Sequence, residues 1–237
     1  MGGQASAPEA GRSLAIGDPA IIDAFASDPD NTTMVSFPRT GSHWLRMMVE
    51  LYFERPTLTR NFYWPDRRDF ILLGTHDLDL DVERQVVLYL YRDPVETIYS
   101  LIRYYQDDPA DPAQVARWLP LYVDHLGKWL VDERFTRRKT IVRYDRLRSD
   151  PFGEFAKVIR HFGGDVDRGR IEQVVAQVTK DAVRAKVGAD DPQVIPVASD
   201  YPALRSRFDE QFGAQIWTTL RADRRYLDRF FRDGASP

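Results

Sequence analysis

The chain of 237 residues contains no cysteine, and this absence excludes several kinds of protein. A disulfide scaffold, a metal site with cysteine ligands and a thiol nucleophile all need that residue. Long apolar runs are missing too, because no stretch approaches the roughly 20 residues that cross a bilayer. The N-terminal residues also lack the basic region and apolar core of a signal peptide. We therefore expect a soluble, cytoplasmic protein, whose Ala- and Arg-rich composition is typical of bacteria.

An excess of basic residues is also missing. The net charge is −3, whereas proteins that bind nucleic acid in general carry a basic excess or stripe. The hydrophobic content of 43% is enough for a substantial core in one domain. Gly, Ala, Ser and Pro dominate the first residues. We therefore predict a flexible tail over residues 1–20 and a single domain over residues 21–237.

Apolar and β-branched runs alternate with helical patterns through residue 162. These runs predict strands at Thr32–Phe37, Phe70–Leu73, Val86–Tyr91 and Thr140–Arg143. Such alternation implies right-handed crossovers and an α/β fold with a parallel sheet. Val86–Tyr91 is apolar without alternation, as expected for a strand that is covered on both faces. The remaining third of the chain has a helical pattern.

A glycine-containing turn, "PRTGSHW", follows the first predicted strand and opens a helix. Turns of this kind hold anions, because free backbone N–H groups point outward at the positive end of a helix dipole. The turn lacks the Gly-Lys-Ser/Thr ending of the nucleoside-triphosphate loop, which argues against ATP chemistry with Mg²⁺. Arg39 instead supplies a planar fork that can grip two oxygens of a sulfuryl or phosphoryl group. Alone, the turn could equally be structural.

A second polar cluster follows the third predicted strand. Asp93 is placed to cap a helix, Pro94 suits the first helical position, and Glu96 completes a capping box. Arg92 precedes this cap and Ser100 lies eight residues later, so guanidinium and hydroxyl can meet on one phosphate. A third cluster, Arg143 to Asp145, follows the fourth strand. Ligands bind at the carboxyl ends of parallel strands, so the three clusters are expected to share one crevice.

These stretches resemble the sulfotransferases that use 3′-phosphoadenosine 5′-phosphosulfate (PAPS), which have a P-loop-like domain. "SFPRTGSHWLR" is similar to the first PAPS motif of that family, Pro-(Lys/Arg)-x-Gly-x-x-Trp. "VVLYLYRDPVETIYSLIRYY" is similar to the second, an Arg followed eight residues later by Ser. "IVRYDRLRSDPFGEF" resembles a third stretch, Tyr-(Glu/Asp)-x-Leu-x-x-Asp-Pro. The resemblance covers roughly residues 32 to 162.

The resemblance implies a five-stranded parallel sheet with helices on both faces, related to the nucleotide kinases. It implies that Arg39 contacts the 5′-phosphosulfate, and that Arg92 and Ser100 hold the 3′-phosphate. By the same resemblance Tyr144 lies near the adenine, although a core tyrosine at a strand end would look the same. The rest of the turn would surround the phosphosulfate with backbone amides and side chains: Thr40, Gly41, Ser42, His43 and Trp44.

A histidine is suited to take a proton from an attacking hydroxyl near neutral pH. "GTHDL" resembles the Lys-Thr-His stretch of the family, in which the histidine is the base, and this makes His76 the predicted base. His43 inside the turn is the rival. Gly74 stands where many relatives have the lysine, so one charge near the sulfuryl group is absent or supplied elsewhere. His125 and His161 have helical surroundings and are read as structural.

The C-terminal third departs from the family. The Arg-Lys-Gly-x-x-Gly stretch that closes the 3′-phosphate site in many relatives is missing. Lys180, Arg184 and Lys186 could replace it, or they could form a solvated helix face. Residues 188–203 are polar and contain proline, so they could form a lid or an ordinary connecting loop.

The function that the resemblance implies is transfer of a sulfuryl group from PAPS to a hydroxyl, with no metal required. The acceptor could be a small molecule, a lipid or a carbohydrate. Aromatic residues in Asn61–Asp69 and Arg103–Asp108 could stack on it or pack the rim. Two other functions stay open. One is a kinase-like phosphotransferase that uses ATP and Mg²⁺. The other is a nucleotide-binding module that has lost turnover.

Overall fold

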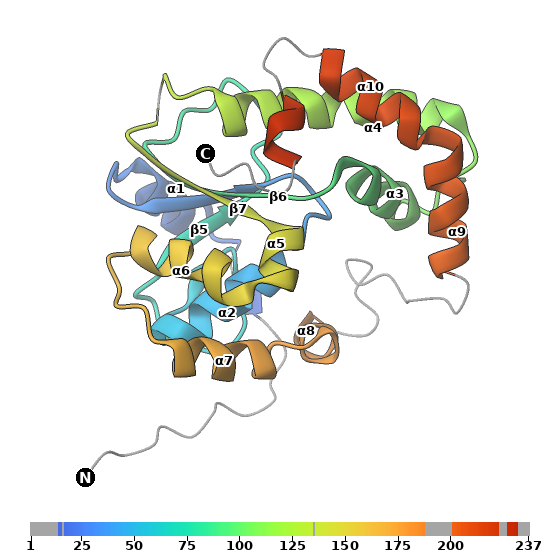
Figure 1. Ribbon diagram of the computed structural model, residues 1–237. Coiled ribbons are helices and arrows are strands. Elements are labelled where there is room, and N and C mark those ends of the chain that lie inside the picture. The colour runs from blue at the N-terminus through green and yellow to red at the C-terminus, as the bar shows by residue number, and fades with distance from the viewer. Residues whose placement is uncertain (1–13, 16, 135, 188–200, 223–226, 232–237) are drawn as a thin grey trace.

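The computed structural model describes residues 14–15, 17–134, 136–187, 201–222 and 227–231. Its centre is a five-stranded sheet in the order β3-β5-β2-β6-β7, in which all neighbouring strands are parallel. The strands are β3 (Thr57–Leu58), β5 (Leu72–Thr75), β2 (Thr32–Ser36), β6 (Val86–Tyr91) and β7 (Arg138–Arg143). Helices cover both faces of this sheet (Figure 1), so the predicted fold class is confirmed.

Two sets of helices enclose the sheet (Figure 1). One set is α3 (Pro94–Tyr104), α4 (Pro112–Leu126), α9 (Tyr201–Phe208) and α10 (Ala214–Ala222). The other set is α2 (Ser42–Phe53), α5 (Tyr144–Ser149), α6 (Pro151–His161), α7 (Arg168–Gln177) and α8 (Lys180–Val187). Within the described residues, no helix combines the length and the apolar character needed to span a membrane.

Strand β6 is buried on both faces, as its unbroken apolar sequence predicted. Val87 and Tyr89 face the core that contains α3 and α4, whereas Leu88 and Leu90 face the core that contains α2 and α6. A smaller third cluster joins helix α1 (Pro19–Ser27) to the β3 and β5 side of the sheet. Because parallel strands in this position have no solvated face, alternation was absent from the sequence.

The predicted helix starts are confirmed at two Asp-Pro pairs. The carboxylate of Asp93 accepts a hydrogen bond from Glu96 N at 3.0 Å, and that of Asp150 accepts one from Gly153 N at 2.9 Å. The expected capping box is wrong in one half, however. The Glu96 carboxylate pairs with Arg92 at 3.0 Å and so does not return to Asp93 N. Asp93 N donates to Asp145 instead.

Several boundaries differ from the sequence prediction. Strand β5 begins at Leu72 rather than Phe70, and helix α4 begins at Pro112, where Asp111 caps it. A π-helix, Gly127–Val131, continues directly from α4. Short strands with no clear pattern were missed: β3, β4 (Arg60–Asn61) and β1 (Leu14–Ala15).

The predicted tail and the predicted lid lie largely outside the described residues. Within residues 1–20, Leu14–Ala15 pair antiparallel with Arg60–Asn61, and α1 begins at Pro19. The domain boundary at residue 20 stays a prediction. Of residues 188–203, the structure describes only 201–203, which form the start of α9.

Two histidines in the packed layers have structural roles, as their sequence surroundings indicated. His125 donates from Nε2 to His76 O at 2.8 Å, and its Nδ1 lies 2.9 Å from the Tyr89 hydroxyl. His161 bridges the hydroxyls of Thr32 and Thr140, at 3.1 and 2.9 Å. Burial lowers the pKa of both His125 and His161 to about 4. Both imidazoles are therefore neutral at pH 7.

These lowered pKa values predict loss of stability in acid. Because the unfolded chain binds protons below pH 6.5 while the folded chain does not, this contribution is complete above about pH 6.5 and falls towards pH 4. We expect each histidine to lower the free energy of unfolding by roughly 1–2 kcal/mol at pH 5, relative to pH 7. Urea unfolding at pH 7 and pH 5 should show a smaller difference for His161→Asn than for the wild type. An equal difference in both would contradict the assignment.

Candidate active site

Strand β2 lies between β5 and β6, so three polar segments meet where these strands end. Val35 is paired with Thr75 on one side and with Tyr89 on the other. The turn that follows β2 therefore lies between His76, next after β5, and Arg92, next after β6. The segments that carry the predicted site residues therefore meet at this edge of the sheet, and their sharing of one crevice stays a prediction.

The turn itself has a strained, open backbone. Arg39 and Gly41 have φ angles of 71° and 97°, and Thr40 is held between them by a 2.7 Å bond from its hydroxyl to Phe37 O. A left-handed conformation costs a non-glycine residue about 1–2 kcal/mol, and such strain is concentrated at functional sites. Gly41 caps α2 without a side-chain hydrogen bond. The amides of the first helical turn, from Ser42 onward, are thus placed to receive an anion.

Tyr144 packs directly beneath this turn. A Cβ atom on Gly41 would lie 2.4 Å from two carbons of the Tyr144 ring. The Trp44 ring meets the same tyrosine edge-to-face at 5.5 Å, and the Arg92 guanidinium lies 4.7 Å from its centroid. Trp44 also donates from Nε1 to Val178 O at 2.9 Å, so it ties α2 to the end of α7. Tyr144 therefore supports the turn, and its contact with adenine stays a prediction.

The structure brings Arg39, Arg92 and Ser100 together. Arg39 Nε lies 3.4 Å from the Ser100 hydroxyl, and Arg92 Nη1 donates to the Arg39 carbonyl at 3.2 Å. Arg92 and Ser100 therefore both contact Arg39, and their meeting on one phosphate stays a prediction. The guanidinium of Arg39 also lies 5.0 Å from the centroid of the Tyr104 ring.

Arg205, on α9, joins this cluster although the sequence analysis did not single it out. Its Nε donates to one oxygen of Glu96 at 2.9 Å, while Arg92 Nη2 donates to the other at 3.0 Å. Arg92 Nε is buried and has no hydrogen-bond partner among the described residues. A phosphate at this position would satisfy it. Arg205 lies about 100 residues after Arg92 and belongs to no family motif, so no sequence pattern pointed to it.

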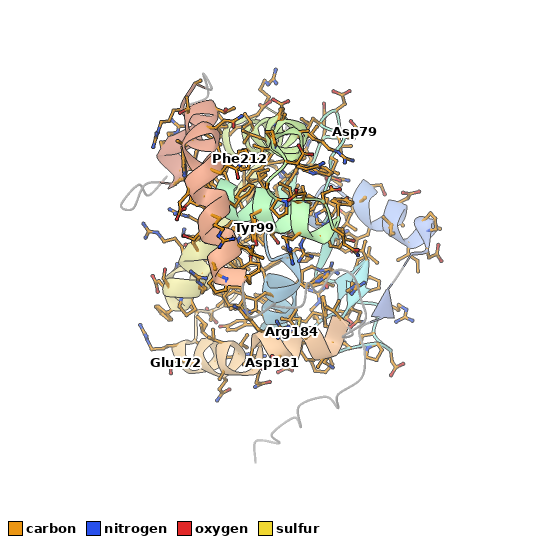
Figure 2. The ribbon with its side chains drawn as sticks, turned by 90° about the vertical axis from the view of Figure 1, so that its right-hand side faces the viewer. Asp79, Tyr99, Glu172, Asp181, Arg184 and Phe212 are labelled. Carbon is orange, nitrogen blue, oxygen red and sulfur yellow. The ribbon has the colours of Figure 1, made fainter. Side chains whose placement is uncertain are left out.

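Two of the three C-terminal cations proposed from sequence have described contacts away from this cluster. Arg184 pairs with Asp181 at 3.3 Å on the same helix, as Figure 2 shows. Lys186 Nζ lies 4.6 Å from the centroid of the Tyr63 ring. Lys180 begins the same helix, α8. Among the described C-terminal residues, Arg205 is therefore a better candidate for the 3′-phosphate than these three.

His76 is held in one tautomer. Its Nδ1 lies 2.7 Å from Ser36 O, and because a carbonyl only accepts hydrogen bonds, Nδ1 must carry the proton. In the neutral ring, Nε2 then carries the lone pair that a general base needs. Burial lowers the pKa of His76, and the nearby guanidiniums of Arg46 and Arg39 lower it further. The imidazole is therefore neutral and ready to accept a proton near pH 7.

His43 lines the same cavity, which has a volume of about 230 Å³. Burial, together with Arg46, Arg60 and other neighbours, lowers its pKa to about 3. The described residues give its ring an edge-to-face contact with Phe62 at 5.6 Å but no hydrogen bond that fixes its tautomer. The cavity is lined by Met34, Ser36, Ser42, His43, Arg46, Thr59, Arg60, Gly74, Thr75 and His76.

Asp77 follows His76 but is poorly placed to act as a base. Its carboxylate accepts two hydrogen bonds from Arg84, at 2.9 and 3.1 Å, and one from Thr75 at 2.7 Å. Both oxygens of this carboxylate are therefore engaged by donors other than an acceptor hydroxyl. Its φ angle of 37° adds a second strained residue beside the cavity.

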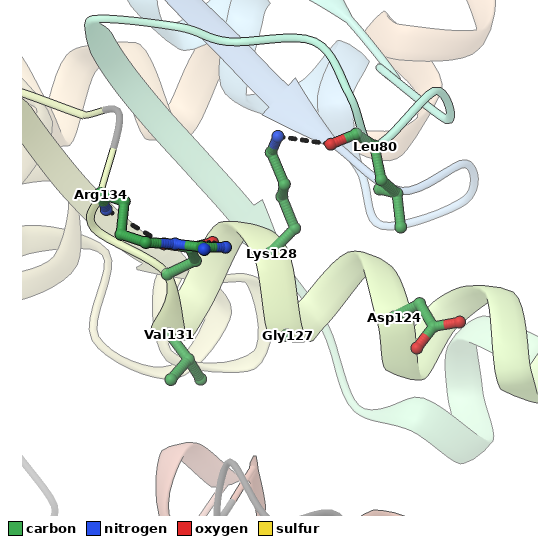
Figure 3. Close-up of a pocket in the computed structure, with 7 residues that line it drawn as sticks. Leu80, Asp124, Gly127, Lys128, Val131 and Arg134 are labelled. Carbon is green, nitrogen blue, oxygen red and sulfur yellow. Dashed lines mark hydrogen bonds and ion pairs between the residues drawn. The ribbon is translucent and has the colours of Figure 1, made fainter.

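A second hollow, of about 430 Å³, lies along the π-helical turn at the end of α4 (Figure 3). Lys128 Nζ donates to Leu80 O across it. None of the predicted site residues lines it. In the part of the chain that the structure describes, no cluster of three or more His, Asp or Glu residues could hold a metal ion.

Comparisons with known proteins agree with this architecture. A family model described as "Sulfotransferase domain" matches residues 83–193. Mouse sulfotransferase SULT7A1, solved with 3′-phosphoadenosine 5′-phosphate (PAP), has a TM-score of 0.60 and 17% identity, with 90% of this chain and 92% of that chain covered.

Retinol dehydratase is similar in two crystal structures. The complex with androsterone and PAP has a TM-score of 0.59 and 12% identity, over 90% of this chain and 84% of that chain. The complex with retinol and PAP has a TM-score of 0.59 and 13% identity, over 92% and 88%. No protein of curated function matches closely enough to count as a relative. The matched domain and the shared fold support the predicted resemblance to the PAPS-dependent sulfotransferases.

The contact between Gly41 and Tyr144 generates a stability prediction. Gly41→Ala adds a methyl group 2.4 Å from the ring and forces a side chain into the left-handed region, so we expect a loss of about 2–4 kcal/mol. Gly163→Ala is a matched control, because its φ is 71° but nothing lies within 4 Å of the added Cβ. It should cost only about 1–2 kcal/mol. Equal losses in chemical unfolding would refute the close packing of Tyr144 under the turn.

Proposed function

We propose that this protein transfers the sulfuryl group of PAPS to a hydroxyl of an acceptor and releases PAP. The observation that carries the proposal is the meeting of three elements at one edge of the sheet. The turn of Arg39, the side chain of Arg92 and the tautomer-fixed His76 all lie there. The fold is shared with sulfotransferases solved with PAP, which supports PAPS as the co-substrate.

The nucleotide is held at two places in this proposal. The 5′-phosphosulfate lies against the turn, where Arg39 and the first amides of α2 supply donors. The 3′-phosphate lies between Arg92 and Ser100, with Arg205 close by through Glu96. A guanidinium fork suits both groups because it donates two parallel hydrogen bonds to one phosphate or sulfate.

The chemical step is an in-line displacement at sulfur. His76 Nε2 takes the proton of the acceptor hydroxyl as the new S–O bond forms, and the S–O bond to the 5′-phosphate breaks. The electron pair of the broken bond leaves with PAP. Positioned charges stabilise this leaving group, and no metal is needed to balance the step.

The acceptor is proposed to be a small molecule, a lipid or a carbohydrate. Structures of the related retinol dehydratase with androsterone and with retinol support the small-molecule class. The cavity of about 230 Å³ between His43 and His76 is where the acceptor hydroxyl would meet the base. We further propose that the reaction takes place in the cytoplasm.

Two binding and turnover experiments separate this function from the alternatives. A PAPS-dependent enzyme should be stabilised to heat by PAP, whereas a kinase-like enzyme should be stabilised by ATP with Mg²⁺. Transfer of label from PAPS to any member of a panel of hydroxylated acceptors then separates an enzyme from a binding module. Stabilisation by ATP with Mg²⁺ but not by PAP would overturn the proposal. Tight PAP binding with no transfer to any acceptor would overturn it as well.

Arg92 should bind the 3′-phosphate selectively. Loss of a charged hydrogen bond costs roughly 1.5–3 kcal/mol, which is about one to two decades in affinity. Arg92→Ala should therefore weaken the binding of PAP far more than the binding of adenosine 5′-phosphosulfate, which has no 3′-phosphate. Arg137→Ala, at an exposed ion pair with Asp30, is the control and should change neither affinity. Calorimetry that shows equal weakening of both nucleotides by Arg92→Ala would exclude this role.

His76 should act as the general base. General-base catalysis is commonly worth about 10²–10⁴ in rate, so His76→Ala should lose turnover by that factor and keep its PAP affinity. Because the pKa of His76 is lowered, the wild-type rate should fall only below the ordinary imidazole value of 6.5, and that acidic limb should vanish in the variant. His43→Ala should lower the affinity for PAP by a larger factor than it lowers the turnover rate. Retained turnover with an unchanged acidic limb in His76→Ala would move the base to His43.

A further inference from the structure

A buried arginine occupies the cavity between the two imidazoles. Arg46, on α2, is 5% exposed and lines the same cavity as His43 and His76. A Cβ atom built on Gly74 would lie 2.8 Å from both the guanidinium carbon and Nη1 of Arg46. Gly74 lies two residues before His76, so both positions face the same side of β5. The guanidinium therefore fills the space that a side chain at position 74 would take.

Neutral acceptors anchor this guanidinium. Its Nε and Nη2 donate to the Thr57 hydroxyl at 3.1 and 3.0 Å, and Nη2 also donates to the carbonyls of Leu58, at 2.9 Å, and Arg60. Among the described residues, hydrogen bonds from the Arg46 side chain leave from these two nitrogens. Nη1 is the nitrogen of Arg46 that lies nearest to a Cβ built on Gly74, at 2.8 Å, and both residues line the cavity.

The partners of Arg46 are themselves held in place by Glu50. One carboxylate oxygen accepts hydrogen bonds from Thr57 N and Oγ1, at 2.9 and 2.7 Å. The other accepts from the amides of Phe62 and Tyr63, both at 2.9 Å. Glu50 is one helical turn from Arg46, but its hydrogen bonds go to this loop. The guanidinium is thus held rigidly without a carboxylate among its hydrogen-bond partners in the described chain.

The charge of Arg46 remains available to an anion. Burial lowers its pKa to about 10, although the charge of Glu50 one helical turn away acts in the opposite direction, so the side chain is still positive near pH 7. A buried charge that is anchored only by neutral groups carries a desolvation cost, which an anion in the cavity would offset. The neighbouring imidazoles are neutral, and Arg39 and Arg60 add further positive charge near His43.

We propose that Arg46 Nη1 binds the non-bridging oxygens of the PAPS sulfuryl group during transfer. This role rests on the proposed function. The residue donates hydrogen bonds and exchanges no proton, while the S–O bond to the 5′-phosphate breaks and the bond to the acceptor oxygen forms. Because its donors are fixed before the substrate arrives, Arg46 stabilises the developing charge without reorganisation.

Calorimetry with PAPS and PAP on the full chain tests this assignment, because only PAPS carries the sulfuryl group. Arg46→Met should raise the Kd for PAPS by about 10- to 100-fold more than the Kd for PAP, as for loss of one charged hydrogen bond. Thr57→Val is the matched control. It removes one of the three oxygens that anchor Arg46 but keeps the charge and the carbonyls of Leu58 and Arg60, so its PAPS-to-PAP ratio should stay close to that of the wild type even if its Tm falls.

A charge swap separates direct contact from a structural role. Arg46→Met combined with Gly74→Lys places a cation at the same point from β5, and it should restore the PAPS-to-PAP ratio to within about threefold of the wild type. Should Arg46→Met fail to fold, Gly74→Ala replaces it, since its methyl group lies 2.8 Å from the guanidinium and must displace it. It should lower the PAPS preference without weakening PAP.

The outcomes distinguish this inference from the proposed function. If the wild type binds neither PAPS nor PAP, both fail. If it binds both, and the ratio is unchanged in Arg46→Met and in Gly74→Ala, the function stands and the role of Arg46 is refuted. A ratio that changes equally in Thr57→Val and Arg46→Met, with no recovery in the charge swap, refutes direct contact as well.

Discussion

The parallel pairing of β2 with β5 on one side and β6 on the other is the constraint on which the site depends. It places His76, the turn of Arg39 and Arg92 in a row at one edge of the sheet. The bond from His76 Nδ1 to Ser36 O then fixes the ring to the end of the central strand. Any shift in this register would separate the proposed base from the anion-binding turn, because adjacent strands carry them independently.

The guanidiniums at this edge have two kinds of partner: a carboxylate pairs with Arg92, whereas neutral oxygens accept hydrogen bonds from the buried Arg46. Arg92 shares Glu96 with Arg205, and Arg205 also pairs with Asp209 at 3.1 Å, so carboxylates oppose the positive charge in this part of the site. Arg46 is anchored by neutral oxygens, and its charge acts on the neighbouring imidazoles. Burial, reinforced by this charge, lowers the pKa of both His43 and His76, so both imidazoles stay neutral. A cavity that combines positive charge with an uncharged base suits transfer of an anionic group to a neutral hydroxyl.

Local sequence patterns predicted the parts of the structure that local forces determine. Strand β6, the Asp-Pro helix starts and the glycine turn each depend on a few neighbouring residues, and all of them appear where they were expected. Strand β3 was missed because two residues carry no periodicity. Arg205 was missed because its contact with Glu96 depends on how the C-terminal helices pack over α3, which no local pattern specifies. The family resemblance supplied the fifth strand and the paired roles of Arg92 and Ser100.

The structure gives an interpretation of Gly74 that differs from the one based on sequence. In the sequence it marks a missing lysine, and so a charge near the sulfuryl group that is absent or supplied elsewhere. In the fold its lack of a side chain is what allows the guanidinium of Arg46 to lie beside β5, since even a methyl group would come within 2.8 Å. Arg46 could not be assigned from sequence, because it sits in an apolar helix where one arginine gives no sign of the strand it faces. The glycine and the arginine are therefore complementary, and a positive charge is retained at this point of the cavity from a different element of the fold.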